Sequence, residues 1–162
     1  MSELLHPYWR MRYVSAPKAA SEGSPFASLL ASGDDRASHI VHRGPACFVI
    51  MNAYPYAPGH LMVLPNREVG ELSQLTAAER AEIMDLLVRC QAVLTAVMKP
   101  AGFNVGLNIG RVAGAGLPGH LHFHVVPRWE GDHNFMPVLA DTRLLPQSLS
   151  ELWETLSAAF KA

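Results

Sequence analysis

Three of the eight histidines stand at alternate positions within five residues, as His120, His122 and His124. In a β-strand, alternate side chains share one face, so the three imidazoles should line one face of the sheet. The intervening residues that should point into the core are Leu121, Phe123 and Val125. Three adjacent imidazoles are poor core material, so this pattern predicts chemistry rather than packing.

Two chemistries fit the cluster. Imidazole is a common metal ligand, and it is also a nucleophile and an acid–base catalyst near neutral pH. Acidic residues are absent between Leu86 and Trp129 and between Arg36 and Arg67, and the second of these windows contains His60. Basic residues lie in or beside the two windows, at Arg67, Arg89, Lys99, Arg111 and Arg128. This charge pattern favours a phosphate-like substrate over a metal ion.

A glycine-rich segment, 110–119, precedes the histidine cluster. Its Gly114-x-Gly116-x-x-Gly119 pattern formally matches a dinucleotide fingerprint, but here it opens a strand rather than a helix and contains Pro118. We therefore set that match aside. Glycines still allow backbone N–H groups to approach an anion closely, so the segment is a candidate phosphate-binding loop.

The composition bounds the class of protein. A chain of 162 residues is the size of one domain, and its net charge of −1 excludes the strongly basic profile of a general nucleic-acid-binding protein. No apolar run approaches the 18 residues of a membrane span, and the first residues lack a signal-peptide core. Two cysteines, Cys47 and Cys90, make no disulfide framework. We expect a cytoplasmic protein without membrane or nucleic-acid partners.

The elements that must position the histidines follow from periodicity and capping signals. Ser24-Pro25 starts a short helix, and Thr76 and Ser148 each open a long helix with a capping box. The expected helices are 26–32, 77–98 and 148–160, and the expected strands are 38–43, 46–52, 60–64, 103–109 and 121–127. Short connections favour antiparallel pairing, with the two long helices on one face of an α+β sheet.

The heptad from His120 to Val126 resembles the signature of the histidine triad (HIT) family. The segment 52–65, with Asn52 and His60, resembles the family's upstream active-site segment. The loop at 113–116 and the stretch 127–138 resemble the bacterial branch that acts on diadenosine tetraphosphate, the phosphorylases and hydrolases.

The resemblance implies a HIT-like fold, with a five-stranded antiparallel sheet that forms a homodimer, and cleavage of a dinucleoside polyphosphate at the α-phosphorus. His122 would be the nucleophile that forms a nucleotidyl-histidine intermediate. His124 would orient the α-phosphate and assist the leaving group, as an imidazolium ion. His120 would help to set the tautomer of His122, and His60 would lie alongside.

The expected substrate contacts come from other segments. The resemblance assigns the ribose to Asn52, and the phosphates to Asn108 with the loop that contains Gly114 and Gly116. Trp129 directly follows the histidine strand, where it could stack on a nucleobase.

Two departures from the family pattern concern phosphate contacts and zinc. Gly116 and Leu117 stand where many members have a Gln-Ser or Gln-Thr pair, so backbone N–H groups must contact the phosphates. Ser24 and Ala27 stand where related bacterial proteins carry a Cys-x-x-Cys zinc pair, so we expect no structural zinc and no required cofactor.

The sequence leaves the acceptor open between inorganic phosphate and water. Alternative functions are an adenosine phosphoramidate hydrolase, a nucleotide-binding sensor with little turnover, and a His-ligated metal protein. We expect one domain over 1–162, with an extension at about 1–23 and a C-terminal loop and helix at 130–162. The remaining histidines belong to no motif and are expected at the surface; they are His6, His39, His42 and His133.

Overall fold

The computed structural model describes residues 23–132 and 148–162. Three α-helices in these ranges are α2 (Pro25–Ala31), α3 (Ala77–Met98) and α5 (Leu149–Lys161), with a short 3-10 turn at Leu72–Gln74. The strands are β1 (Ile40–Arg43), β2 (Cys47–Met51), β3 (Leu61–Pro65), β4 (Gly102–Gly106) and β5 (Phe123–Arg128). The expected extension at 1–23, which contains His6, lies almost entirely outside the described residues, and so does His133.

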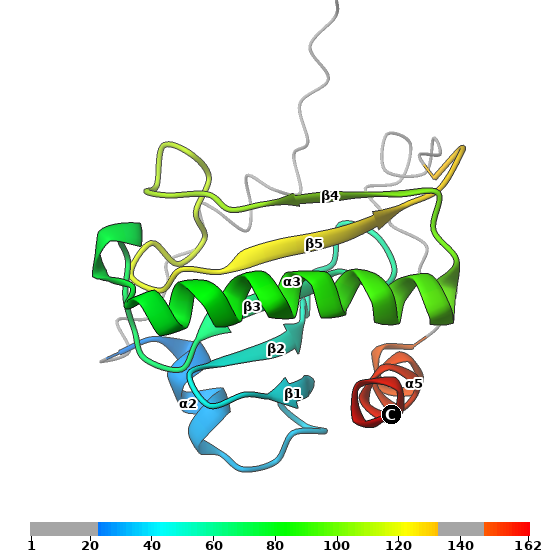
Figure 1. Ribbon diagram of the computed structural model, residues 1–162, viewed down its shortest axis with the longest axis horizontal. Helices are drawn as coiled ribbons and strands as arrows, with labels where there is room; N and C mark the ends of the chain where they lie inside the picture. Colours follow the sequence, from blue (N-terminus) through cyan, green and yellow to red (C-terminus); the bar gives the residue numbers. More distant parts are fainter. Residues whose placement is uncertain (1–22, 133–147) are drawn as a thin grey trace, which may run out of the picture.

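The five strands form one antiparallel sheet in the order β1-β2-β3-β5-β4 (Figure 1). The predicted sheet is thus confirmed, and each described strand falls within two residues of an expected start. Strand β5, which follows the histidine cluster, is central and pairs with β3 on one side and β4 on the other.

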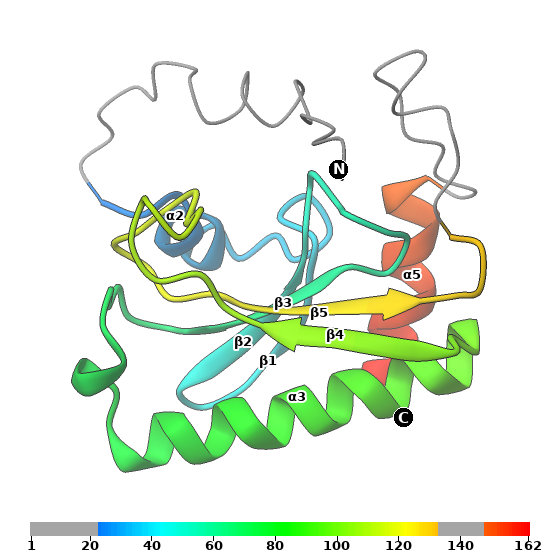
Figure 2. The same cartoon turned by 90° about the horizontal axis from the view of Figure 1, so that it is seen from above.

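The two long helices cover one face of the sheet, as expected, and α2 lies on the other face (Figure 2). Helix α3 begins at its Thr76–Glu79 capping box and ends at Lys99, which has a left-handed backbone with φ of 50° directly before Pro100. Its apolar side packs with α5 and the strands in one large core. The tryptophan of α5, Trp153, also donates to the carbonyl of Ile40 at 2.8 Å.

The opposite face of the sheet carries a smaller apolar cluster. Its strand residues are Ile40, Phe48, Ile50, Met62 and Leu64. Helix α2 packs there through Phe26, Leu29 and Leu30. Ser24 caps this helix, because its hydroxyl accepts a hydrogen bond from the N–H of Phe26 at 3.3 Å. The loop before β5 lies on the same side of the sheet as α2 (Figure 2).

Strand β5 starts later than the alternation of histidines predicted. The pairing of β5 with β3 begins at Phe123, which lies opposite Val63. Strand β3 ends two residues after Val63, at Pro65. Proline has no N–H to donate, so the ladder is not continued there. His120 and His122 therefore precede the strand, and only His124 belongs to it.

None of the helices within the described ranges has the length and apolarity required to cross a membrane.

Candidate active site

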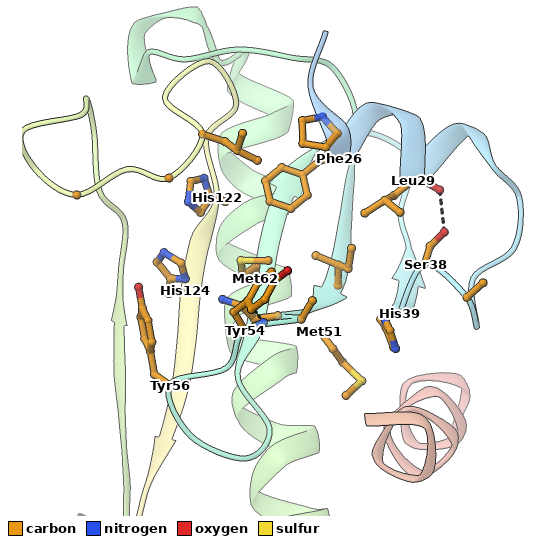
Figure 3. Close-up of a pocket in the computed structure, with 18 residues that line it drawn as sticks. Phe26, Leu29, Ser38, His39, Met51, Tyr54, Tyr56, Met62, His122 and His124 are labelled. Atoms are coloured by element: carbon orange, nitrogen blue, oxygen red, sulfur yellow. Dashed lines mark hydrogen bonds between the residues drawn. The ribbon is translucent and has the colours of Figure 1, made fainter. Parts of the chain in front are cut away.

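A cavity of about 330 Å³ lies on the face of the sheet that carries α2. Figure 3 shows His122 and His124 along one side and Phe26 and Leu29 of α2 across from them. Strands β2 and β3 contribute Ile50, Met51 and Met62, and the glycine-rich loop contributes Gly114, Gly116 and Leu117. The cavity thus joins an apolar side to a side with imidazoles and loop backbone.

His122 has a tautomer fixed by the backbone. Its Nδ1 lies 2.8 Å from the carbonyl oxygen of His120. A carbonyl oxygen only accepts, so Nδ1 carries the proton. In a neutral ring the lone pair is then on Nε2. The side chain is 6% exposed and lines the cavity, which is the placement required for a nucleophile.

His60 and His124 form a hydrogen-bonded pair next to His122. The N–H of Tyr56 lies 3.1 Å from Nδ1 of His60, so that nitrogen accepts and neutral His60 carries its proton on Nε2. His60 Nε2 lies 2.9 Å from Nδ1 of His124 and donates to it. His124 then has its proton on Nε2. This relay makes His124 a neutral hydrogen-bond donor, whereas an imidazolium ion was expected from the charge of the leaving oxygen.

His120 is not on the cavity wall. It is 1% exposed and lies behind His122, with its ring between the hydroxyl of Ser24 and the carbonyl of Pro65. His120 still lies on the face of the sheet that carries α2, as predicted, because its ring contacts that of Phe26 at a centre distance of 5.7 Å, while Leu121 packs in the opposite core. The helix covers it there, and its backbone carbonyl holds the Nδ1 proton of His122.

Burial lowers the pKa of His120, with a smaller lowering from His122, while the hydrogen bond with Pro65 and the charge of Glu68 raise it. In the unfolded chain the ring takes up a proton near pH 6.5. Below that pH the unfolded state binds more protons, so His120 contributes stability that is present above about pH 6.5 and lost as the pH falls. We expect the free energy of unfolding, measured by urea titration, to fall between about pH 7 and about pH 5.

In the His120→Gln variant the free energy of unfolding should depend less on pH than in the wild type, whatever its value at pH 7. His42 gives a matched comparison, because burial, followed by the charge of Arg89, lowers its pKa as well. His42→Gln should remove a separate part of the same dependence. An unchanged slope in His120→Gln would contradict the assignment of His120 as a buried neutral ring.

Asn52, Gly114 and Gly116 line the cavity, as a substrate-binding role requires. The side-chain oxygen of Asn52 accepts from the N–H of Tyr54 at 2.8 Å, and its amide nitrogen lies 3.4 Å from His60 Nδ1. Gly114 has φ of 90°, a conformation that favours glycine, so the tight bend of the loop beside His122 depends on this residue.

The structure does not bring Asn108 and Trp129 into the cavity. Asn108 follows β4 by two residues, and Gly106 pairs with His124, so the antiparallel register carries Asn108 toward His122 without reaching the cavity wall. Trp129 follows β5 at its far end, and its indole N–H donates to the carbonyl of Met98 at 3.4 Å. An extended strand separates Trp129 from His124 by roughly 17 Å, and its stacking on a base stays a prediction.

The electrostatics of the cavity match the acid-free windows of the sequence. No Asp or Glu of the described ranges lines it. One carboxylate does lie close behind: Glu68 influences His120 and accepts from the N–H of Ser24 at 2.8 Å. The sequence did not indicate this carboxylate, because Glu68 lies just outside the acid-free segment that ends at Arg67. It approaches His120 only in the folded chain.

Sequence reasoning also missed several residues of the cavity. His39, expected at the surface, is half-buried, lines the cavity, and has φ of 58°. Tyr56 stacks near His60 and His124, at ring-centre distances of 4.7 Å and 5.8 Å. The periodicity of the short helix could have indicated Phe26 and Leu29 as a packing face, but nothing local marks the backbone of His39.

Metal ligation has little support in this arrangement. Within residues 23–132 and 148–162, no group of three or more His, Cys, Asp or Glu is placed to hold an ion. Ser24, at one of the positions where related proteins carry cysteine, instead donates to His120. The absence of a structural zinc stays a prediction.

Comparison with known proteins identifies the family. A family model described as HIT domain matches residues 34–131, which include both segments that form the cavity's imidazole wall. The chain belongs to the HIT domain family. His120, His122 and His124 lie within the matched residues.

Two curated HIT relatives carry informative names. The AP-4-A phosphorylase of Mycobacterium tuberculosis is 42% identical over 158 residues, which cover 93% of this chain and 80% of the relative. The asymmetrical bis(5'-nucleosyl)-tetraphosphatase of Schizosaccharomyces pombe is 32% identical over 95 residues, which cover 59% of this chain and 52% of the relative.

The fold also matches solved structures. The Hit-like protein of Bartonella henselae has a TM-score of 0.67 at 20% identity, covering 87% of this chain and 99% of that one. At this identity the likeness concerns the fold, and it agrees with the five-stranded antiparallel sheet.

Proposed function

We propose that this HIT protein cleaves diadenosine tetraphosphate at an α-phosphorus through a nucleotidyl-histidine intermediate, and that inorganic phosphate is the acceptor. The observation that carries the proposal is the tautomer of His122, whose Nδ1 proton is held by the His120 carbonyl so that the lone pair is on Nε2. The relationship to the M. tuberculosis AP-4-A phosphorylase supports the substrate and the acceptor.

In the first step, Nε2 of His122 attacks the α-phosphorus. A P–N bond forms as the P–O bond to the bridging oxygen breaks, and ATP leaves with the electron pair. The Nε2–H of His124 donates a hydrogen bond to the leaving oxygen and stabilises its charge. A polyphosphate leaving group needs no full proton transfer, so the neutral state that His60 imposes on His124 is compatible with this step.

In the second step, an oxygen of inorganic phosphate attacks the same phosphorus. The P–N bond breaks, ADP forms, and the electron pair returns to His122 Nε2. The cavity wall has no acidic side chain within the described ranges, so the approach of a second anion meets no fixed negative charge. Backbone N–H groups near Gly114 and Gly116 are the proposed phosphate donors.

The apolar side of the cavity is the proposed nucleobase site. Phe26, Leu29 and Ile50 supply flat or branched apolar surface, and Asn52, which lines the same cavity with its amide nitrogen 3.4 Å from His60 Nδ1, is the proposed ribose contact. A volume of about 330 Å³ lies at the lower end of the range for small-ligand sites, and fits one nucleoside better than two. The second nucleoside then extends outward with the leaving group.

Product analysis tests the function and the acceptor together. We expect diadenosine tetraphosphate to yield ADP and ATP only when phosphate is present, as resolved by ion-exchange chromatography, with label from ³²P-phosphate appearing at the β-position of ADP. Formation of AMP and ATP without phosphate would instead assign hydrolysis, the activity named for the S. pombe relative. No cleavage under either condition would overturn the proposal and favour a nucleotide sensor.

Two alternative functions can each be tested by experiment. An adenosine phosphoramidate hydrolase would release AMP from that compound faster than it cleaves diadenosine tetraphosphate. A metal-dependent enzyme would lose activity on exhaustive chelation, and we expect activity to persist.

The homodimer and the cytoplasmic location remain predictions. Among the described strands, β4 pairs only with β5, and its Val105 is 49% exposed at the sheet edge. Met84 and Val88, one turn apart on α3, are 60% and 61% exposed. An open strand edge and an exposed apolar helix stripe favour pairing with a second copy. The cysteines Cys47 and Cys90 are buried thiols, which suits a reducing compartment.

A further inference from the structure

Ser24 links helix α2 to the histidine cluster. Its hydroxyl lies 2.8 Å from Nδ1 of His120, and Nε2 of His120 lies 2.9 Å from the carbonyl oxygen of Pro65. The carbonyl fixes the proton of the neutral ring on Nε2, so Nδ1 accepts and the serine hydroxyl donates. The same oxygen accepts from the N–H of Phe26 at 3.3 Å. Ser24 therefore fixes both a helix start and the ring of His120.

Glu68 holds Ser24 in this position. Its Oε2 accepts from the backbone N–H of Ser24 at 2.8 Å. Its other carboxylate oxygen lies against Gly119, since a Cβ built on that glycine would come within 3.2 Å of it. The carboxylate thus spans the start of α2 and the residue that precedes His120, and Ser24 itself is only 5% exposed.

This support matters because the strand ladder does not reach His120. Pairing of β5 with β3 begins at Phe123, and Pro65 ends β3 without an N–H to donate. The imidazole of His120 supplies the donor that the Pro65 carbonyl receives. Backbone bonds hold the peptide groups on either side, since the N–H of Leu121 donates to the Val69 carbonyl at 2.8 Å and that of His120 to the Leu117 carbonyl at 3.3 Å. The contacts of the imidazole ring add to these in orienting the backbone carbonyl of His120, which accepts the Nδ1 proton of His122 at 2.8 Å.

We propose that Ser24 is a positioning residue for His122: its hydroxyl fixes the ring of His120, and thereby the carbonyl that sets the tautomer and direction of the nucleophile. This inference rests on the proposed function, because the residue positioned is the nucleophile of that reaction. Ser24 touches no reacting atom and does not line the cavity.

Four variants separate this role from helix capping. Ser24→Ala removes the cap and the hydroxyl, whereas Ser24→Gly removes the hydroxyl and retains most of the capping preference. Ser24→Thr keeps both functions. Ser148→Ala is the matched control, because Ser148 caps α5 in the same way, through the N–H of Glu151, and does not line the cavity.

The first measurement is the single-turnover rate of nucleotidyl-His122 formation from diadenosine tetraphosphate, with AMP affinity measured separately. We expect Ser24→Ala and Ser24→Gly to lower the rate by about tenfold while AMP affinity stays within about twofold, the loss expected when one hydrogen bond that orients a reacting group is removed. Ser24→Thr should recover most of the rate, and Ser148→Ala should match the wild type. A wild-type rate in Ser24→Gly, or equal losses of rate and affinity, would overturn the proposal.

The second measurement needs no turnover. Ring ¹⁵N shifts report which nitrogen of each histidine carries its proton, and we expect a single Nδ1–H form of His122 in the wild type and a mixture in Ser24→Gly. An unchanged His122 tautomer in Ser24→Gly would contradict the inference. If the wild type forms no nucleotidyl-enzyme at all, the proposed function fails, while the ring spectra still decide the role of Ser24.

Discussion

Replacing His122 by alanine is expected to lower kcat for diadenosine tetraphosphate by at least about 10³-fold, while AMP still binds with nearly wild-type affinity. The reason is that Nε2 of this ring forms the P–N bond, and neither His124 nor His120 offers the same combination of position and tautomer. Its partner His124 has its proton on Nε2, because His60 donates to its Nδ1 at 2.9 Å. His120 lies behind the wall with both nitrogens hydrogen-bonded.

The measurements are steady-state kinetics, calorimetric titration with AMP, and mass spectrometry of the quenched enzyme. The wild type should show a covalent nucleotidyl adduct that is absent from His122→Ala. His122→Gln, which keeps a polar side chain in the cavity, should show the same loss. His42→Ala is the control, since His42 packs against Phe160 of α5, away from the cavity. Wild-type turnover in either His122 variant would refute the nucleotidyl-histidine mechanism.

The helices could be predicted from local sequence because their signals are local. Thr76 with Glu79 and Ser148 with Glu151 form capping boxes within one turn, and the expected bounds of α3 are those observed, Ala77–Met98. The strands were placed nearly as well, and short connections predicted the antiparallel pairing of the first three. The five-stranded sheet was implied by the family resemblance, and the position of β5 between β3 and β4 was not predicted.

The sequence indicated many of the residues that form the candidate site, but it indicated less well where they lie relative to one another. Alternation placed His120 on the correct face, but it could not show that the start of α2 covers its ring, which is 1% exposed. Proximity in sequence suggested Trp129 as a base-stacking residue, although a straight strand carries it away from His124. A period of two tells which face a side chain is on, but not which other element covers that face.

Contacts between distant segments had no signal in the sequence at all. Ser24 and His120 are 96 residues apart, and the capping pattern accounts for Ser24 without reference to the histidines. His39 lines the cavity and has a left-handed backbone directly before β1, and no residue pattern shows either feature. Glu68 and His120 approach each other across the end of β3, so a count of acids along the chain placed the carboxylate outside the site.

His124 should determine how the enzyme treats different leaving groups. The relay from the Tyr56 N–H through His60 places a proton on His124 Nε2, next to the ring of His122 at a centre distance of 5.0 Å. A polyphosphate can leave as an anion that accepts a hydrogen bond. An amine leaves only with a proton, so its departure requires His124 to take up a second proton and act as an imidazolium acid, which becomes a neutral imidazole when it protonates the amine.

We therefore expect His124→Gln to lower kcat/KM for diadenosine tetraphosphate by about 10²-fold, and for adenosine 5'-phosphoramidate by a further factor of about ten. His60→Gln should cause a smaller loss with both compounds, because it removes the orientation of His124 and leaves the donor in place. His122→Gln should be equally inactive with both, since the nucleophile is needed whatever leaves. Equal losses for the two leaving groups in His124→Gln would show that His124 only shapes the cavity, and that the proton reaches the leaving group from elsewhere.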